Sequence, residues 1–172
     1  MSGNSFYFIS ILFLFLLNGC TNSMPGIEQQ NKDVVRSAFK IVGTGDFDNM
    51  ENFFTPAYTR HCPSTPNVKV NSLSEFKEYV RQDRMVITDQ ILTVKKLIAE
   101  GDLVAFWATY QGTQTGQMGP FPPSDKFMEI EFSGYHRLED GKIAESWIIW
   151  DNLSALTQLG HFSAPSAASG AN

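Results

Sequence analysis

Two strand-like segments separated by a two-residue turn constrain the fold of this chain more than any other feature. Residues 126–138 and 142–150 are rich in aromatic and β-branched side chains, and Asp140-Gly141 lies between them. Asp-Gly is a favoured pair for a tight hairpin, because such a turn needs positive φ angles at both central residues. The sequence therefore predicts an antiparallel hairpin here, and with it a sheet.

Helical patterns come before the strands. Apolar residues recur at helical spacing over residues 27–42, and the glycines that follow end this helix. A short second helix is expected to begin at residues 46–50 and to end near Thr55-Pro56. Ser72-Leu73-Ser74-Glu75 is typical of the capping box that begins a third helix.

The pattern changes after Thr88. Residues 88–99 and 103–111 predict two further strands, whereas the Gly- and Pro-rich residues 112–125 predict a loop. A last helical turn is expected over residues 153–159. Helices followed by a meander of long strands indicate an α+β domain.

The composition limits the class of protein and its partners. The chain has 172 residues, with 13 Lys and Arg against 18 Asp and Glu, and a net charge of −5 at pH 7. This length fits one domain with a sizeable core. Binding to nucleic acid needs a basic surface, and no cluster of Lys and Arg occurs in the sequence, so no nucleic-acid partner is expected.

The N-terminal segment predicts export. Residues 6–17 form an apolar run that is shorter than the roughly 20 residues of a membrane-spanning helix, as is typical of a signal peptide. The run ends in Leu17-Asn18-Gly19-Cys20, which resembles the cleavage box of bacterial lipoproteins, although no Lys or Arg precedes it. The resemblance implies cleavage after Gly19, lipidation of Cys20 and a membrane-anchored lipoprotein of a bacterial cell envelope. An ordinary cleaved signal and an uncleaved anchor are the alternatives.

These features divide the chain into four parts. We expect a signal peptide over residues 1–19, a tether over 20–26, a folded domain over 27–160 and a disordered tail over 161–172. Cys62 is then a lone thiol in an exported domain, and we expect it to be at least partly buried.

An ordered series of short motifs runs through the domain. It includes Gly45-Asp46-Phe47, residues 54–61 (FTPAYTRH), residues 98–105 (IAEGDLVA), residues 112–116 (GTQTG) and residues 140–147 (DGKIAESW). No single motif is specific, but the series with its gaps resembles the SnoaL-like polyketide cyclase (ester cyclase) family from about Ile27 to Gly160.

The resemblance implies a cone-shaped α+β domain, in which N-terminal helices pack on a curved, mainly antiparallel sheet that encloses a pocket. It also implies a small apolar ligand or substrate, frequent homodimers, and ring closure by intramolecular aldol condensation without metal or cofactor. Such chemistry needs a positioned acid/base that takes a proton alpha to a carbonyl group. A carboxylate in an apolar pocket suits this task, since desolvation raises its pKa toward neutrality.

The chain departs from the family at the positions that carry this chemistry. As the motifs align, the acid/base Asp of the cyclases falls at Ile148, and the His that assists it falls at Gly134. Gln114 likewise stands where the family motif has His. The resemblance therefore implies the fold, but it does not imply that the chain catalyses the same reaction.

Counting outward from the predicted turn indicates other candidates. If Glu139 faces Lys142 and no bulge intervenes, His136 pairs with Glu145. One face of the hairpin would then carry the groups suited to a pocket, namely His136, Glu145, Trp147 and Asp151. The other face would carry Arg137, Ser146, Ile148 and Trp150.

Three residues are the candidate catalytic groups: Asp151, Glu145 and His61. Asp151 is expected as the acid/base, with capping of the last helix as its alternative role. Glu145 forms a dyad with His136 or only a cross-strand ion pair. His61 hydrogen-bonds a ligand carbonyl group or is satisfied within a loop. The three histidines are scattered without ligand spacing, so no metal site is expected.

Aromatic and polar side chains are the candidate ligand contacts: Tyr58, Trp107, Gln114, Phe121, His136 and Trp147. For the large aromatic residues, packing in the core is the alternative. Residues 120–123 (PFPP) predict a rigid lid at the mouth of the pocket, or a surface turn.

Two functions therefore remain open. The first is a cofactor-independent enzyme of cyclase, isomerase or dehydratase type that acts on a small carbonyl compound. The second is a lipoprotein that holds a small apolar molecule in the same pocket without chemistry. Export and the residues at positions 134 and 148 favour the second, and the family resemblance favours the first.

Overall fold

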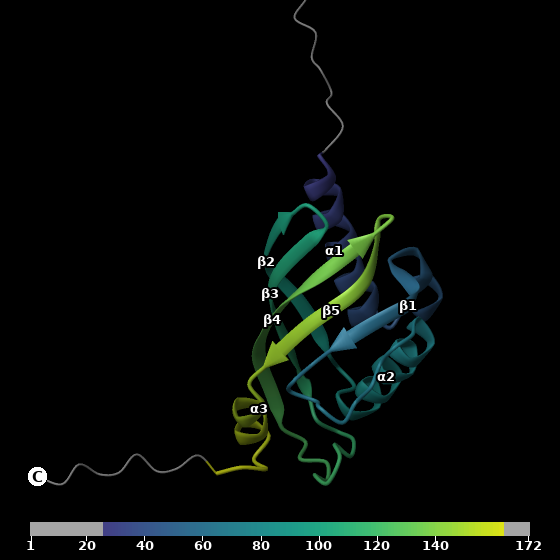
Figure 1. The fold of residues 1–172 in the computed structure, drawn as a ribbon. Helices are drawn as coiled ribbons and strands as arrows, with labels where there is room; N and C mark the ends of the chain where they lie inside the picture. The colour runs from purple at the N-terminus through teal and green to yellow at the C-terminus, as the bar shows by residue number, and fades with distance from the viewer. Residues whose placement is uncertain (1–25, 164–172) are drawn as a thin grey trace, which may run out of the picture.

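The elements follow the expected order, with helices first and strands after them. The computed structural model describes residues 26–163 (Figure 1). The first half comprises α1 (Ile27–Thr44), the short 3₁₀ helix η1 (Phe47–Asn52), β1 (Phe54–His61) and α2 (Leu73–Val86). The second half comprises β2 (Ile91–Glu100), β3 (Leu103–Thr113), β4 (Phe127–Glu139), β5 (Lys142–Trp150) and α3 (Asn152–Gln158). In this part of the chain, no helix is both long and apolar enough to cross a membrane.

Within residues 26–163, the strands form one five-stranded sheet in the order β1-β5-β4-β3-β2. β1 runs parallel to β5, and the other neighbours are antiparallel. α1 packs on β2 and β3, α2 packs on β1, and α3 packs on β4 (Figure 1). The predicted α+β fold, with N-terminal helices on a curved and mainly antiparallel sheet, is confirmed.

Local signals explain two of the element boundaries. Asp140 and Gly141 have φ angles of 49° and 73°, which are the positive values that the tight turn requires. At the start of α2, Ser72 Oγ accepts a hydrogen bond from the backbone N–H of Glu75 at 3.2 Å. The carboxylate of Glu75 in turn accepts from the backbone N–H of Asn71 at 2.6 Å, which completes a capping arrangement.

One extra residue in β5 changes the predicted pairing of the hairpin. Leu138 faces Ile143, but Arg137 then faces Glu145, so Ala144 is a bulge. Ile143 and Ala144 are both buried, and the bulge is what places two successive apolar side chains inside.

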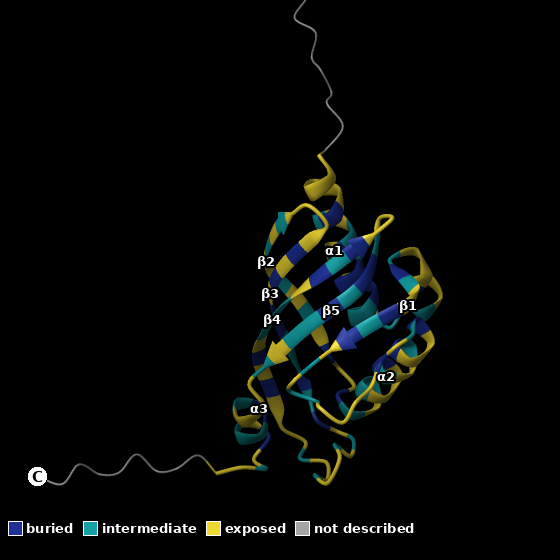
Figure 2. Cartoon of the chain, in the orientation of Figure 1, coloured by how far each residue is buried: buried dark blue, intermediate teal, exposed yellow. Residues whose placement is uncertain are grey.

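The bulge overturns the predicted pairing of His136 with Glu145. His136 pairs with Ser146 instead, because a shift of one residue moves every following side chain to the other face. His136, Ser146 and Ile148 therefore lie on the inner face, whereas Glu145 and Trp147 lie on the outer face. Buried and exposed positions alternate along β3 and β4 in the same way (Figure 2).

A short chain of polar side chains crosses the core beneath this hairpin. Tyr58 donates its hydroxyl hydrogen to Ser146 Oγ at 2.9 Å, and Ser146 Oγ lies 2.7 Å from Nδ1 of His136. A hydroxyl group has one hydrogen and two lone pairs, so Ser146 bonds to Tyr58 and to the imidazole at the same time, and the tautomer of His136 sets the direction of the second bond. The rings of Phe39 and Phe106 pack against the imidazole, and Nε2 has no hydrogen-bond partner among the described residues.

His136 makes the stability of the fold depend on pH. Burial lowers the pKa of His136 to about 3, whereas a histidine in an unfolded chain titrates near about 6.5. A lowered pKa means that the folded state favours the neutral ring. The stabilisation is therefore complete above about pH 6.5 and is lost as the pH falls toward about 3.

We expect His136→Leu to flatten the loss of stability in acid. Between about pH 6.5 and 3 the wild-type protein should lose up to about 1.4 kcal/mol of unfolding free energy per pH unit from this group, and the variant should lack that component. Urea unfolding at several pH values measures both slopes. The slopes are compared, not the absolute stabilities, because Leu also removes the hydrogen bond between residue 136 and the Ser146 hydroxyl. Equal slopes in the two proteins would contradict the assignment.

Candidate functional site

The predicted site residues lie in four separate places, and one of these is the outer face of the sheet. His61 Nε2 and Glu145 Oε1 lie 2.7 Å apart, and Arg137 Nε donates to the other Glu145 oxygen at 3.2 Å. The hydrogen bond from His61 is the main cause that holds the pKa of the Glu145 carboxyl below its usual range. The ring of Trp147 stacks on His61 and on Tyr135, at centroid distances of 5.0 and 4.6 Å. Trp107 lies on the same face, on β3.

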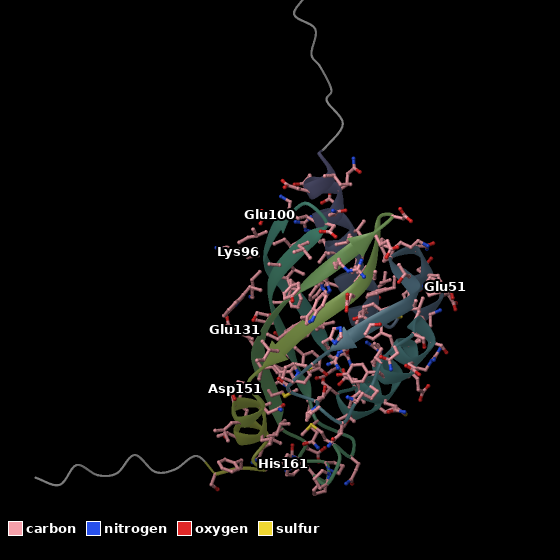
Figure 3. All side chains as sticks on the ribbon, in the orientation of Figure 1. Glu51, Lys96, Glu100, Glu131, Asp151 and His161 are labelled. Carbon is pink, nitrogen blue, oxygen red and sulfur yellow. The ribbon has the colours of Figure 1, made fainter. Side chains whose placement is uncertain are left out.

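Asp151 lies at the start of α3 and caps it (Figure 3). Its Oδ1 accepts hydrogen bonds from the backbone N–H groups of Leu153 at 2.9 Å and Ser154 at 3.1 Å. This is the alternative role that the sequence left open for Asp151. Its expected role as an acid/base stays a prediction, and its carboxylate is already engaged by the helix.

Gln114 and Phe121 belong to the loop between β3 and β4. Gln114 is fully buried, and its Nε2 donates to the carbonyl oxygens of Gly116 and Pro122, each at 3.0 Å. His161, which follows α3 (Figure 3), lies 2.6 Å from Gln114 Oε1 and stacks on Phe121. These contacts give the loop its shape. Cys62 is half-buried, as expected, and Cys20 lies outside the described residues.

Positions 134 and 148, where the resemblance leads us to expect the dyad of the cyclases, lie against the backbone of β5 and the hydrophobic core. Gly134 faces Ile148 across the β4–β5 pair, and Ile148 packs against the hydrophobic core. A Cβ atom on residue 134 would lie 2.0 Å from the carbonyl oxygen of Trp147. The backbone of β5 therefore excludes a histidine at this position. Tyr58 and His136 lie in the same closed interior.

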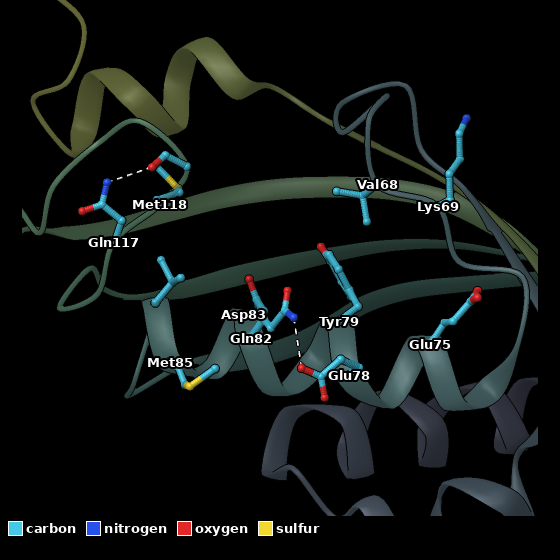
Figure 4. A pocket seen from close by; sticks show the side chains of 12 residues that line it. Val68, Lys69, Glu75, Glu78, Tyr79, Gln82, Asp83, Met85, Gln117 and Met118 are labelled. Atoms are coloured by element: carbon cyan, nitrogen blue, oxygen red, sulfur yellow. Dashed lines mark hydrogen bonds between the residues drawn. The ribbon is translucent and has the colours of Figure 1, made fainter.

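An open groove lies instead beside α2 (Figure 4). Its volume is about 700 Å³, within the range of roughly 300–1,000 Å³ that is usual for small-molecule sites. One wall is α2 from Glu75 to Val86, and the others are Val68-Lys69 and residues 117–119 of the β3–β4 loop. The backbone N–H groups of Thr115 and Gly116 both donate to the carbonyl oxygen of Val86, which attaches this loop to the end of α2.

Asp83, on α2, is a largely desolvated carboxyl group that lines this groove. Tyr110 donates its hydroxyl hydrogen to Asp83 Oδ2 at 2.9 Å, and Gln90 Nε2 donates to the same oxygen at 3.2 Å. Among the described residues, Oδ1 is therefore the oxygen left to exchange a proton. Burial raises the pKa of the Asp83 carboxyl, and the two hydrogen bonds and the charges of Arg60 and Arg84 oppose this rise only in part.

Tyr79 precedes Asp83 by one helical turn, so the two side chains lie on the same face of α2. Figure 4 shows both directed from the helix into the groove, on the side of Val68 and Met118. Burial raises the pKa of Tyr79, so its hydroxyl keeps its hydrogen at neutral pH. The groove thus combines a proton acceptor and a hydrogen-bond donor with apolar side chains, and Lys69, Glu75 and Glu78 also line it.

The sequence offered only a weak signal for these residues. Tyr79 fits the apolar stripe of α2, and Asp83 beside Arg84 is typical of a solvated helix face. A carboxylate four residues after a tyrosine, on one face of a helix that begins with a capping box, was the available signal. Its meaning depends on Tyr110 and Gln90, which come from other parts of the chain.

Known structures and families share this architecture. The family model of the SnoaL-like polyketide cyclases matches residues 32–159. IdmH from Streptomyces antibioticus, a candidate polyketide cyclase, is 26% identical, with a TM-score of 0.69, over 76% of this chain and 99% of its own. A candidate SnoaL-like polyketide cyclase from Jannaschia sp. CCS1 is 22% identical, with a TM-score of 0.72, over 83% of this chain and 99% of its own.

The fold also occurs in a protein with a different assigned chemistry. AclR from Streptomyces galilaeus, a candidate hydroxylase, is 20% identical, with a TM-score of 0.69, over 81% of this chain and 87% of its own. Likeness at this level of identity concerns the fold, and the chemistry has to be argued from the site. No curated protein sequence matches the chain significantly.

Proposed function

Because the chain belongs to the SnoaL-like polyketide cyclase family, we propose that it acts on a small apolar carbonyl compound by cofactor-independent acid/base catalysis. The reaction is of cyclase, isomerase or dehydratase type, and it takes place in the groove beside α2. The observation that carries the proposal is Asp83, a carboxyl group with one oxygen held by Tyr110 and Gln90 and with a pKa raised by burial.

Asp83 is the general base of this proposal. Its free oxygen takes a proton from the carbon next to the substrate carbonyl group, and the same carboxyl later returns a proton to the product. Burial suits the task, because a desolvated carboxylate is a stronger base than a hydrated one. The apolar rim of the groove, with Val68, Met85 and Met118, suits an apolar substrate.

We expect Asp83→Asn to lower the rate of proton exchange by a factor of about 10² or more, with the fold retained. The assay follows the replacement of alpha protons by deuterium in a panel of ketones by NMR. Asp151→Asn is the matched control, because Asn also caps a helix and should leave both the fold and the exchange intact. Loss of exchange in Asp151→Asn but not in Asp83→Asn would show that Asp151, and not Asp83, is the general base.

A non-catalytic binder is the second candidate function, and Ile148 and Gly134 favour it, because they replace the dyad of the family. A carrier should copurify with a stoichiometric apolar molecule that native mass spectrometry detects and that stays unchanged on incubation. Chemical conversion of that molecule by the protein would favour the enzyme instead.

We also propose that the protein is an exported lipoprotein anchored through Cys20. The support is the apolar run of residues 6–17 followed by Leu17-Asn18-Gly19-Cys20. In bacteria fed an alkyne-labelled fatty acid, the wild-type protein should carry the label and sediment with membranes. Cys20→Ser should lose both properties, and Cys62→Ser should keep them. An unlabelled wild-type protein would contradict the proposal.

A homodimer through the outer face of the sheet completes the proposal. Trp107 and Ile149 are 47% and 54% exposed there, next to Tyr135, and exposed apolar patches of this kind mark interaction surfaces. Light scattering should give twice the monomer mass for the wild-type protein and the monomer mass for Ile149→Glu. Ile27→Glu, on the equally exposed start of α1, is the control that should remain dimeric. A monomeric wild-type protein at all concentrations would contradict a dimer.

A further inference from the structure

Arg60 is a buried cation that no carboxylate neutralises directly. Its side chain comes from the inner face of β1, and the residue is 6% exposed. Within residues 26–163, Arg60 forms no ion pair with an acidic side chain. Its hydrogen bonds go to two hydroxyl groups, from Nη1 to Thr65 at 3.2 Å and from Nη2 to Tyr79 at 3.3 Å. Burying a charge without a direct ion pair is costly, so a buried guanidinium of this kind favours negative charge nearby, and its charge already acts on the Asp83 carboxyl by lowering the pKa of that group.

Aromatic rings hold the guanidinium in place. It lies 4.6 Å from the ring centroid of Tyr79 and 5.6 Å from that of Trp150. Stacking between two rings fixes the plane of the group and leaves it little freedom to reach the solvent. The positive charge is therefore held against the ring of Tyr79.

The hydrogen bond from Arg60 determines what Tyr79 does. The Tyr79 oxygen accepts from the guanidinium, so its own hydrogen is free to be donated elsewhere. Tyr79 lines the groove, and its hydroxyl is the polar end of a side chain directed into it (Figure 4). A donor that is polarised by a cation is a stronger donor, particularly toward a negatively charged oxygen.

We propose that Tyr79 and Arg60 form an oxyanion site in the groove, which binds the enolate oxygen of the substrate of Asp83. This inference rests on the proposed function and names the form in which the substrate is held. Asp83 and Tyr79 lie one helical turn apart, so a single small carbonyl compound is able to contact both.

The electrons of the step balance without a further reagent. The alpha C–H bond breaks, and its proton goes to the free oxygen of Asp83. The electron pair of that bond forms the new C=C bond, and the π pair of the carbonyl group moves to its oxygen. That oxygen becomes negative, and Tyr79 donates a hydrogen bond to it while the guanidinium of Arg60, which is bonded to the Tyr79 hydroxyl, stabilises the charge.

The site selects compounds that have an acidic carbon or a phenolic oxygen. A carbonyl compound without an alpha hydrogen would bind only through its apolar part and would not develop the charge that Arg60 compensates. Apolar phenols should therefore bind to the groove as phenolates, because a phenolate resembles an enolate in charge and shape.

The test uses 4-nitrophenol and the purified full chain, at a pH where the free probe is neutral. Binding should produce the absorption of the phenolate, because the site stabilises the anion. Tyr79→Phe should weaken phenolate binding by about tenfold or more, as expected for a hydrogen bond to a charged group. Arg60→Gln should weaken it at least as much, whereas Asp83→Asn should not weaken it, because that change removes a negative charge.

A matched neutral probe separates charge from shape. 4-Nitroanisole has the same ring and cannot ionise. Its affinity should therefore change less than about twofold in Tyr79→Phe, because a hydrogen bond to a neutral ether oxygen contributes much less than one to a charged oxygen. Tyr79→Phe removes one oxygen from a ring that otherwise keeps its packing, and it decides the question if Arg60→Gln does not fold. Binding of the probe as the neutral phenol, or phenolate binding that is equal in wild type and Tyr79→Phe, would overturn the inference.

The two proposals fail in distinguishable ways. If ketone exchange depends on Asp83 but phenolate binding is unchanged in the Tyr79 and Arg60 variants, the proposed oxyanion site is wrong and the assignment of Asp83 as the base is retained. If phenolate binding depends on Tyr79 and Arg60 but no ketone exchanges, the anion site stands and the proposed catalysis is wrong.

Discussion

The bulge at Ala144 is the feature on which the rest of the structure depends. It places Ile143 and Ala144 inside together and moves all the following side chains of β5 by one face. Ser146 thereby reaches Tyr58 and His136 in the core, and Glu145 reaches His61 on the outer face. Without the bulge, a carboxylate and an indole of β5 would point into the core, and Ser146 would lie on the outer face, away from Tyr58 and His136.

The interior that results is closed, and the polar chemistry lies at its margin. The phenylalanine rings around His136 fill the space under the hairpin, and Ile148 adds to them. The groove beside α2 has the opposite character, since it is open to solvent and has a carboxyl group and a phenol along one side, with the guanidinium of Arg60 in contact with the phenol. A carboxyl held by Tyr110 and Gln90, from two other segments, is positioned more rigidly than a single helix would allow.

The sequence predicted the features that depend on neighbouring residues. The Asp140-Gly141 turn and the Ser72 cap follow from local backbone chemistry, and the strands from β2 to β5 follow from composition and length. β1 was not predicted as a strand, because Pro56 lies within it and its parallel partner β5 is far away in the sequence. The bulge was not predictable from the pattern, since Ile143-Ala144 is equally consistent with a regular strand. The role of Asp83 was not predictable from the sequence either, because the residues around its carboxyl group are brought together only by the tertiary fold.

The contact between Gly134 and the backbone of β5 limits which substitutions this part of the sheet can accept. A histidine at position 134 would need β5 to move first, and an aspartate in place of Ile148 would put a charge at a partly buried position that packs against the core. Each single step toward the dyad is therefore unfavourable by itself, and only several changes made together would be tolerated. A chain with glycine and isoleucine at these two positions is therefore kept as it is by the backbone of β5, and a new chemistry is gained more easily in the groove that is open to solvent.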